Sequence, residues 1–355
     1  MTNNMENSFF IFSSAENSIT IERFHTCIWE FKNNTSLVEF GCELPGNSLP
    51  PDQMTLSFFI PWFTEDSETR NLYDKLSQPE NSRFIFNDSI HSTHSLDGGV
   101  NELGVIHHFS DRALCILPVD FKKRAEFLDV TLDLRSYREH AAKELPNVYF
   151  RFWVEPKLSH ISTRKNGINR STVIYDIKIN ERRNIPGNHL KYFSDKKLCK
   201  IKYCYLFNII PNKYDIIYID STSIKNVRTL EYPSFQKYMG DRRVRNDELI
   251  VFFNKKEELD SYSFFSIYGK ERIGAGQFAF AVLANIICGV LLFVPSYREA
   301  QDPQLSIFEV WKHLPAEVYI AIALALATAS YFIWPKIAVA TGNFRNWIKR
   351  KFKSK

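Results

Sequence analysis

The stretch NVYFRFWVEP, residues 147–156, decides the fold because apolar side chains occupy every second position. In an extended chain, such residues share one face. The residues of this face are Val148, Phe150, Phe152 and Val154. A period of two over this length predicts a β-strand with a buried face.

Similar runs recur through residues 1–272, separated by polar turns. They lie at 27–32, 36–44, 54–60, 83–88, 113–119, 128–134, 172–180, 200–210, 214–220, 248–254 and 261–268. Helical signals are few and predict helices at 64–76 and 135–145. The pattern predicts a mainly β (α+β) domain of two β lobes, with the polar stretch 157–171 as the seam between them.

Composition and charge narrow the class of protein. Apolar residues make up 45% and charged residues 24%, which excludes a disordered or fibrous chain. Residues 1–156 carry 13 basic and 23 acidic side chains, whereas 157–202 carry 12 basic and 3 acidic. We therefore expect an acidic lobe at 1–156 and a second lobe at 157–272 that begins with a basic segment.

The basic segment is a candidate contact for nucleic acid or a protein partner. Its candidate contact residues are Arg164, Lys165, Arg170, Arg182, Arg183, Lys196, Lys197 and Lys200. Cations contact phosphates, and interleaved aromatic residues can stack on bases. Two alternatives stay open, namely pairing with the acidic lobe and contact with anionic lipid headgroups.

Two apolar runs without charge follow at 273–294 and 318–335. As helices they span roughly 33 and 27 Å, close to a hydrocarbon core of about 30 Å. They predict a transmembrane hairpin joined by an external loop at 295–317.

The flanking charges predict the orientation of the hairpin. The loop carries two basic and four acidic residues, whereas 336–355 carry seven basic residues and no acid. By the positive-inside rule both termini are cytoplasmic, so we expect a multi-pass protein of the cell inner membrane. The N-terminal residues lack the basic start and long apolar core of a signal peptide.

Small and polar residues form a seam along the hairpin. They are Gln277, Ala281, Asn285 and Cys288 in the first span and Thr328 in the second. Such residues let helices approach closely and form hydrogen bonds at membrane depth. The seam indicates either packing within one hairpin or a homo-oligomer with a water-lined path.

The C-terminal tail, 336–355, predicts a basic amphipathic helix on the membrane surface. Its anchor residues are Trp347, Lys349, Arg350 and Lys351. An aromatic face with flanking cations is typical of helices that bind lipid headgroups.

Catalytic motifs are missing from the sequence. Four histidines, His91, His94, His107 and His108, lie near Asp97 and could surround a metal. However, Asp97 begins an Asp-Gly-Gly turn, and no helix sets a ligand spacing. We predict no catalytic residue, no metal and no cofactor.

A cytoplasmic domain without catalytic motifs, followed by a two-span hairpin, resembles the two-transmembrane effectors of bacterial retron anti-phage systems. The resemblance rests on the layout of 273–335 and on the size of the preceding domain. It implies an abortive-infection effector that disrupts the inner membrane when its partner releases it. The implied partner is a cognate reverse transcriptase with its RNA–DNA hybrid. The alternatives are a non-toxic membrane-tethered adaptor and a membrane-anchored enzyme.

Overall fold

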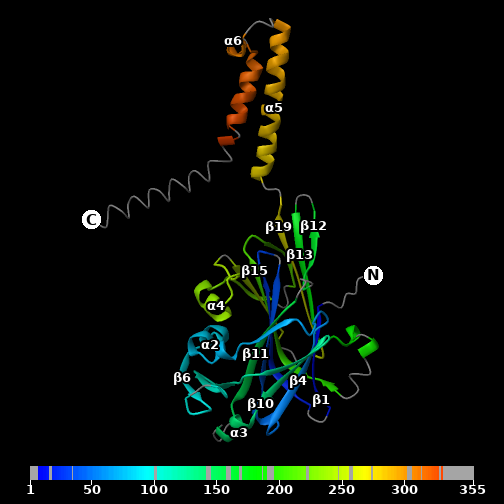
Figure 1. Cartoon of the computed structure of the whole chain (residues 1–355), viewed down its shortest axis with the longest axis vertical. Helices are drawn as coiled ribbons and strands as arrows, with labels where there is room; N and C mark the ends of the chain where they lie inside the picture. Colours follow the sequence, from blue (N-terminus) through cyan, green and yellow to red (C-terminus); the bar gives the residue numbers. More distant parts are fainter. Residues whose placement is uncertain are drawn as a thin grey trace, which may run out of the picture. The chain divides into compact units, whose positions relative to one another are not determined.

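The computed structural model separates the chain into two compact units, Met1–Lys165 with Thr172–Lys270, and Asn166–Ser171 with Glu271–Lys355. The first unit is a β domain, and the second holds the apolar helices (Figure 1). The residues described by the structure are 7–15, 18–33, 35–99, 102–140, 145–156, 161–167, 170–185, 187–189, 196–220, 224–246, 248–255, 259–272, 275–301, 306–312, 314–327 and 329–330.

One sheet has nine strands and is mixed. Its order is β16 (Asp215–Ile219), β19 (Tyr262–Glu271), β13 (Arg170–Ile179), β1 (Ser8–Ser14), β4 (Gln53–Phe59), β10 (Phe127–Asp133) and β9 (Asp120–Arg124). Outside this order, β12 (Thr163–Asn166) pairs with β13, and β14 (Lys196–Leu198) pairs with β1. The central strand β1 is parallel to β13 and antiparallel to β4.

The other sheet has ten strands and is also mixed. Its order is β17 (Ile224–Thr229), β18 (Glu248–Lys255), β15 (Lys200–Pro211), β2 (Thr20–Glu30), β3 (Ser36–Leu44), β11 (Asn147–Glu155), β8 (Ala113–Ile116), β7 (Val105–Phe109) and β6 (Ile90–Ser95), while β5 (Glu68–Asn71) pairs with β11. Strands β2 and β15 are parallel, and β2 and β3 are antiparallel.

Short helices complete the β domain. They are η1 (Gly46–Ser48), α1 (Tyr73–Leu76), α2 (Pro79–Phe86), α3 (Arg135–His140), η2 (Arg182–Asn184), η3 (Gly187–His189) and α4 (Tyr232–Met239). Residues of α1, α2 and α4 share a hydrophobic cluster with Trp29 of β2 and Tyr149 of β11. These helices therefore cover one face of the ten-stranded sheet.

The main core lies between the two sheets. Phe58 of the nine-stranded sheet meets Phe152 of the ten-stranded sheet edge to face, with ring centroids 5.0 Å apart. Phe9 and Ile11 of β1 belong to this core, whereas Phe10 and Phe12 form a separate cluster. Because side chains alternate along a strand, the second pair lies on the outer face of the nine-stranded sheet.

The prediction of a mainly β domain is confirmed. Two mixed sheets correspond in number to the two expected β lobes. Each sheet draws strands from both sides of residue 156, so the layers are not consecutive stretches of chain. The acidic and basic segments are consequently interleaved within one β domain.

Two local predictions are wrong. Residues 83–88 were expected to form a strand but lie mostly in α2, which begins at Pro79 and is followed by Asn87 in a left-handed conformation (φ 52°). Proline favours a first helical turn, and asparagine tolerates the left-handed region. The helix expected at 64–76 is reduced to α1, because β5 pairs with β11 instead. The described part of the helix expected at 135–145 is α3.

The second unit contains α5 (Ala275–Gln301), α6 (Ile307–Lys312) and an apolar helix at Ala316–Ala327. Its segment Gly276–Ala300 has a mean hydropathy of 2.4 and is long enough to cross a membrane. The helix at Ala316–Ala327 is apolar but shorter. Thr328 and the expected anchor residues Trp347, Lys349, Arg350 and Lys351 lie outside the described residues.

Candidate functional site: a basic groove on the nine-stranded sheet

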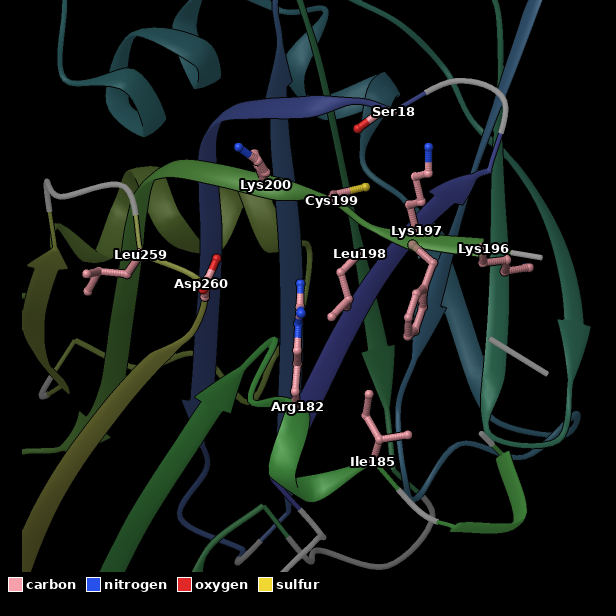
Figure 2. A pocket seen from close by; sticks show the side chains of 11 residues that line it. Ser18, Arg182, Ile185, Lys196, Lys197, Leu198, Cys199, Lys200, Leu259 and Asp260 are labelled. Carbon is pink, nitrogen blue, oxygen red and sulfur yellow. The ribbon is translucent and has the colours of Figure 1, made fainter. Parts of the chain in front are cut away.

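Half of the predicted contact residues line one cavity of about 540 Å³, shown in Figure 2. We call this cavity the basic groove and define it by Arg182, Lys196, Lys197 and Lys200. Among the other lining residues, Phe12, Ile185, Leu198 and Leu259 are apolar, and Asp260 is the one described acid. The groove therefore combines an apolar surface with an excess of positive charge.

A short strand and a buried asparagine position the cations. β14 pairs antiparallel with β1, which aligns Lys197 with Ser13 and Leu198 with Phe12. Asn180 is buried in a left-handed conformation (φ 57°) at the end of β13. Its amide Nδ2 donates to the carbonyl oxygen of Cys199 at 2.9 Å, and its Oδ1 accepts from the amide of Ile11 at 3.0 Å.

Asn180 thus ties together three chain segments that are distant in sequence. Arg182 follows it by two residues and extends from η2 toward the centre of Figure 2. Sequence reasoning missed Asn180. An asparagine directly after a strand is a signal for a left-handed residue, which makes the position recognisable in retrospect.

The four cations of the groove are not equivalent. The ammonium of Lys196 donates to Ser57 Oγ and lies 3.8 Å from the Asp129 carboxylate. Partial burial lowers the pKa of Lys196. In Figure 2, Lys196 points away from Arg182 and Lys200. Lys196 therefore has a structural role at the margin of the groove.

Arg182 and Lys197 are exposed, and the structure describes no carboxylate partner for either. Together with Lys200, they give the groove three cations oriented toward solvent or the cavity. In proteins that bind nucleic acids, such clusters of lysine and arginine most commonly contact the phosphate groups.

The other four predicted contact residues lie elsewhere. Arg164 pairs with Glu30, a buried carboxylate that also accepts from Tyr175 at 2.7 Å. Arg183 pairs with Glu181 at 3.0 Å. Pairing with an acid of 1–156 thus accounts for Arg164 and Lys196. Lys165 on β12 and Arg170 on β13 are exposed and do not line the groove.

The histidine cluster forms a hairpin of β6 and β7. His107 is buried; its Nδ1 contacts Thr93 Oγ1 at 2.8 Å, and its Nε2 contacts the carbonyl oxygen of Leu76 at 2.8 Å. Asp97 accepts from the amide of Leu103 at 3.1 Å and stabilises the turn. Within the described ranges, no group of three or more His, Cys, Asp or Glu residues could hold a metal ion.

Comparisons with known proteins do not assign a family. No family model and no curated protein matches the chain. Solved structures that share some geometry include an M1 zinc metallopeptidase from Deinococcus radiodurans, with a TM-score of 0.28, 8% identity and coverage of 72% of this chain and 43% of that chain. A mutant of a two-domain M1 zinc metallopeptidase bound to L-tryptophan gives a TM-score of 0.28, 8% identity and coverage of 72% and 44%.

The chain spans less than half the length of these structures. A TM-score of 0.28 is too low to support an argument about fold or function.

Proposed function

We propose that the chain is a membrane-anchored effector of a bacterial anti-phage system, which disrupts inner-membrane integrity when its partner releases it. The observation that carries this proposal is α5, a 27-residue helix that is apolar and largely exposed in the isolated chain. Such a helix needs a membrane or other helices to cover it. In the proposed topology, both termini are cytoplasmic, the loop at 295–317 is external, and the tail at 336–355 binds lipid headgroups.

The exposure pattern of α5 supports a role beyond anchoring. Leu283, Ile286 and Val290 are half-buried and lie on one face of α5. The predicted seam residues Ala281, Asn285 and Cys288 are exposed. At 100° per residue, these three residues lie opposite Leu283, Ile286 and Val290, whereas the half-buried Ala284 lies between the two faces.

The second apolar helix shows the complementary pattern. Ala325 is 5% exposed, and Ala321 and Ala329 are half-buried. The alanine stripe is therefore a less exposed face of this helix, which supports packing within the proposed hairpin. The covered faces leave Ala281, Asn285 and Cys288 exposed to another molecule.

A second copy of the chain is the proposed occupant of this seam. An amide that faces hydrocarbon without a partner is costly, whereas two copies of Asn285 could bond each other or water. Measured transmembrane hydrogen bonds average only about 0.6 kcal/mol, so fold stability is a weak reason to place an amide there. A homo-oligomer with a water-lined seam would explain why Asn285 lies in the apolar helix and how the membrane loses its integrity.

The basic groove supplies the proposed contact with the partner. A reverse transcriptase carrying an RNA–DNA hybrid presents a row of phosphates to Arg182, Lys197 and Lys200. Binding would hold the effector inactive, and loss of the partner would free α5 to assemble.

The test compares two double variants of the full chain expressed in cells. Gln277→Leu with Asn285→Leu should insert normally, because leucine favours insertion, and should abolish depolarisation of the inner membrane. The matched control is Phe280→Leu with Phe293→Leu, which changes exposed residues of α5 outside the seam and should remain active. If the seam variant inserts and still depolarises cells fully, the hairpin is an anchor and the adaptor alternative holds.

A further inference from the structure

A second cavity, of about 390 Å³, lies on the outer face of the ten-stranded sheet beside α2 and α4. Its volume is within the range of about 300–1,000 Å³ found for small-molecule sites. Five cations and no carboxylate occur among its described lining residues. The cations are Arg23, Arg112, Arg151, Lys225 and Arg228. We call this the aromatic–cationic cavity.

One wall of the cavity is aromatic. Alternation along β15 and β18 places Tyr205, Phe207 and Phe252 on the same face. The rings of Phe207 and Phe252 stack with centroids 4.4 Å apart and planes at 6°. All three side chains are half-buried, so part of this aromatic surface faces the cavity. Aromatic rings of α2 and α4, including Phe84 and Phe235, also line it.

The cations around this wall outnumber the carboxylates that pair with them. Arg23 and Arg112 share one carboxylate, Glu43, at 3.7 and 3.2 Å. Lys225 Nζ lies 5.1 Å from the centroid of the Phe252 ring, and the structure describes no carboxylate partner for it. An anion near the aromatic wall would therefore meet net positive charge from two sides.

The floor of the cavity is held by buried polar contacts. The Arg151 Nε donates to Glu39 at 2.6 Å, and Glu39 also accepts from Trp29 Nε1 at 2.7 Å. Beside Arg151, the Nδ1 of His25 contacts the Tyr149 hydroxyl at 3.1 Å. These contacts fix the side chains before any ligand arrives, which favours binding.

A glycine is required for this floor. A Cβ added at Gly41 would lie 2.2 Å from the Tyr149 hydroxyl. Any other residue at this position would displace the tyrosine from His25. Burial and the positive charge of Arg151, Arg23 and Arg112 lower the pKa of His25 well below its usual value. The ring is therefore neutral at pH 7.

We propose that the aromatic–cationic cavity binds a nucleotide. Its heteroaromatic ring would lie against Phe207, Phe252 and Tyr205, and its phosphates would lie near Arg23, Arg112 and Lys225. Ring stacking and charge-assisted hydrogen bonds are the two interactions that a nucleotide offers together. The cavity shares no lining residue with the basic groove, so this inference does not depend on the proposed function.

The experiment titrates the full-length chain in detergent with ATP and with tripolyphosphate, which has the charge but no ring. Calorimetry should give binding of ATP at least about tenfold tighter than tripolyphosphate, because stacking adds to the phosphate contacts. Phe252→Leu keeps an apolar side chain and should remove most of this preference. Lys225→Glu, at an exposed position, should weaken both ligands by about tenfold.

The matched control is Lys122→Glu, an equal charge change at an exposed position on β9. It should leave both affinities unchanged. The proposal is overturned if ATP and tripolyphosphate bind equally, if Lys225→Glu has no larger effect than Lys122→Glu, or if none of the four ribonucleoside triphosphates binds at millimolar concentration. It is also overturned if a single-stranded oligonucleotide binds and the mononucleotides do not.

Discussion

At the scale of single residues, His107 shows how a candidate ligand becomes a structural residue. Both of its ring nitrogens have partners, one in β6 and one at the end of α1. Burial lowers the pKa of His107 below its usual value of 6.5. In the unfolded chain this histidine gains a proton near pH 6.5, whereas in the folded chain it stays neutral to a lower pH. The unfolded state therefore binds more protons as the pH falls below 6.5.

Because the pKa of His107 is lowered in the folded state, the free energy of unfolding should decrease at acid pH. The stabilisation is fully present above pH 6.5 and declines by up to about 1.4 kcal/mol per pH unit until the lowered pKa is reached. His107→Gln cannot gain the proton, so its free energy of unfolding should change less between pH 7.5 and 5.5 in denaturant titrations. Equal slopes in the wild-type and variant proteins would contradict the assignment.

At the scale of elements, strands with one period-two face were predictable. The run at 36–44 coincides with β3, where every second residue from Val38 to Leu44 is apolar and Glu39, Gly41 and Glu43 lie between them. The strand β1 was missed because both of its faces carry apolar side chains, which removes the alternation. Residues 83–88 were misjudged since their aromatic run suits a strand as well as the covered face of α2.

The two cavities also show how far a site can be predicted from the sequence. The sequence identified the cations of the basic groove because four of them lie within 19 residues of each other. It could not show that Lys196 meets Asp129, because that contact depends on the strand order of the sheet. The aromatic–cationic cavity draws on β2, β15, β17 and β18, so its residues come together only through the pairing of these strands.

We predict that the basic groove binds an RNA–DNA hybrid in a salt-dependent way and that Lys196 does not take part. Lys197→Glu with Lys200→Glu should weaken binding of an RNA–DNA hybrid to the full chain and lower the slope of log affinity against log salt by about one per lysine that contacts a phosphate. Fluorescence anisotropy at several salt concentrations measures both effects. The control, Lys122→Glu with Arg245→Glu, carries the same charge change at exposed positions outside the groove. Equal losses in both double variants would indicate a general charge effect.

At the scale of the whole molecule, the chain joins a β domain of mixed sheets to a unit with an apolar helix long enough for a bilayer. The charges around that helix are asymmetric, with two basic and four acidic residues in 295–317 and seven basic residues in 336–355. The positive-inside rule uses this asymmetry to orient a hairpin.

The predicted orientation can be measured with reporter fusions. Alkaline phosphatase inserted within 296–316 should be active, because that loop is expected outside the inner membrane, whereas a fusion after Lys355 should be inactive. A cytoplasmic fluorescent reporter at the same two sites should give the reverse pattern. Activity of the phosphatase at both sites would show that the chain crosses the membrane once.

The pairing of early with late strands has a consequence for synthesis. Strand β1 pairs with β13 and β14, and β2 pairs with β15, so partners are separated by more than 160 residues. Contacts of such long range slow folding and leave apolar strands unpaired in the meantime. On the ribosome, one edge of β1 can pair with β4 early, but the other edge has no partner until β13 and β14 have emerged. The β domain is then completed by β19, immediately before α5 leaves the exit tunnel. Folding of this domain and emergence of the apolar helix α5 are thus nearly simultaneous.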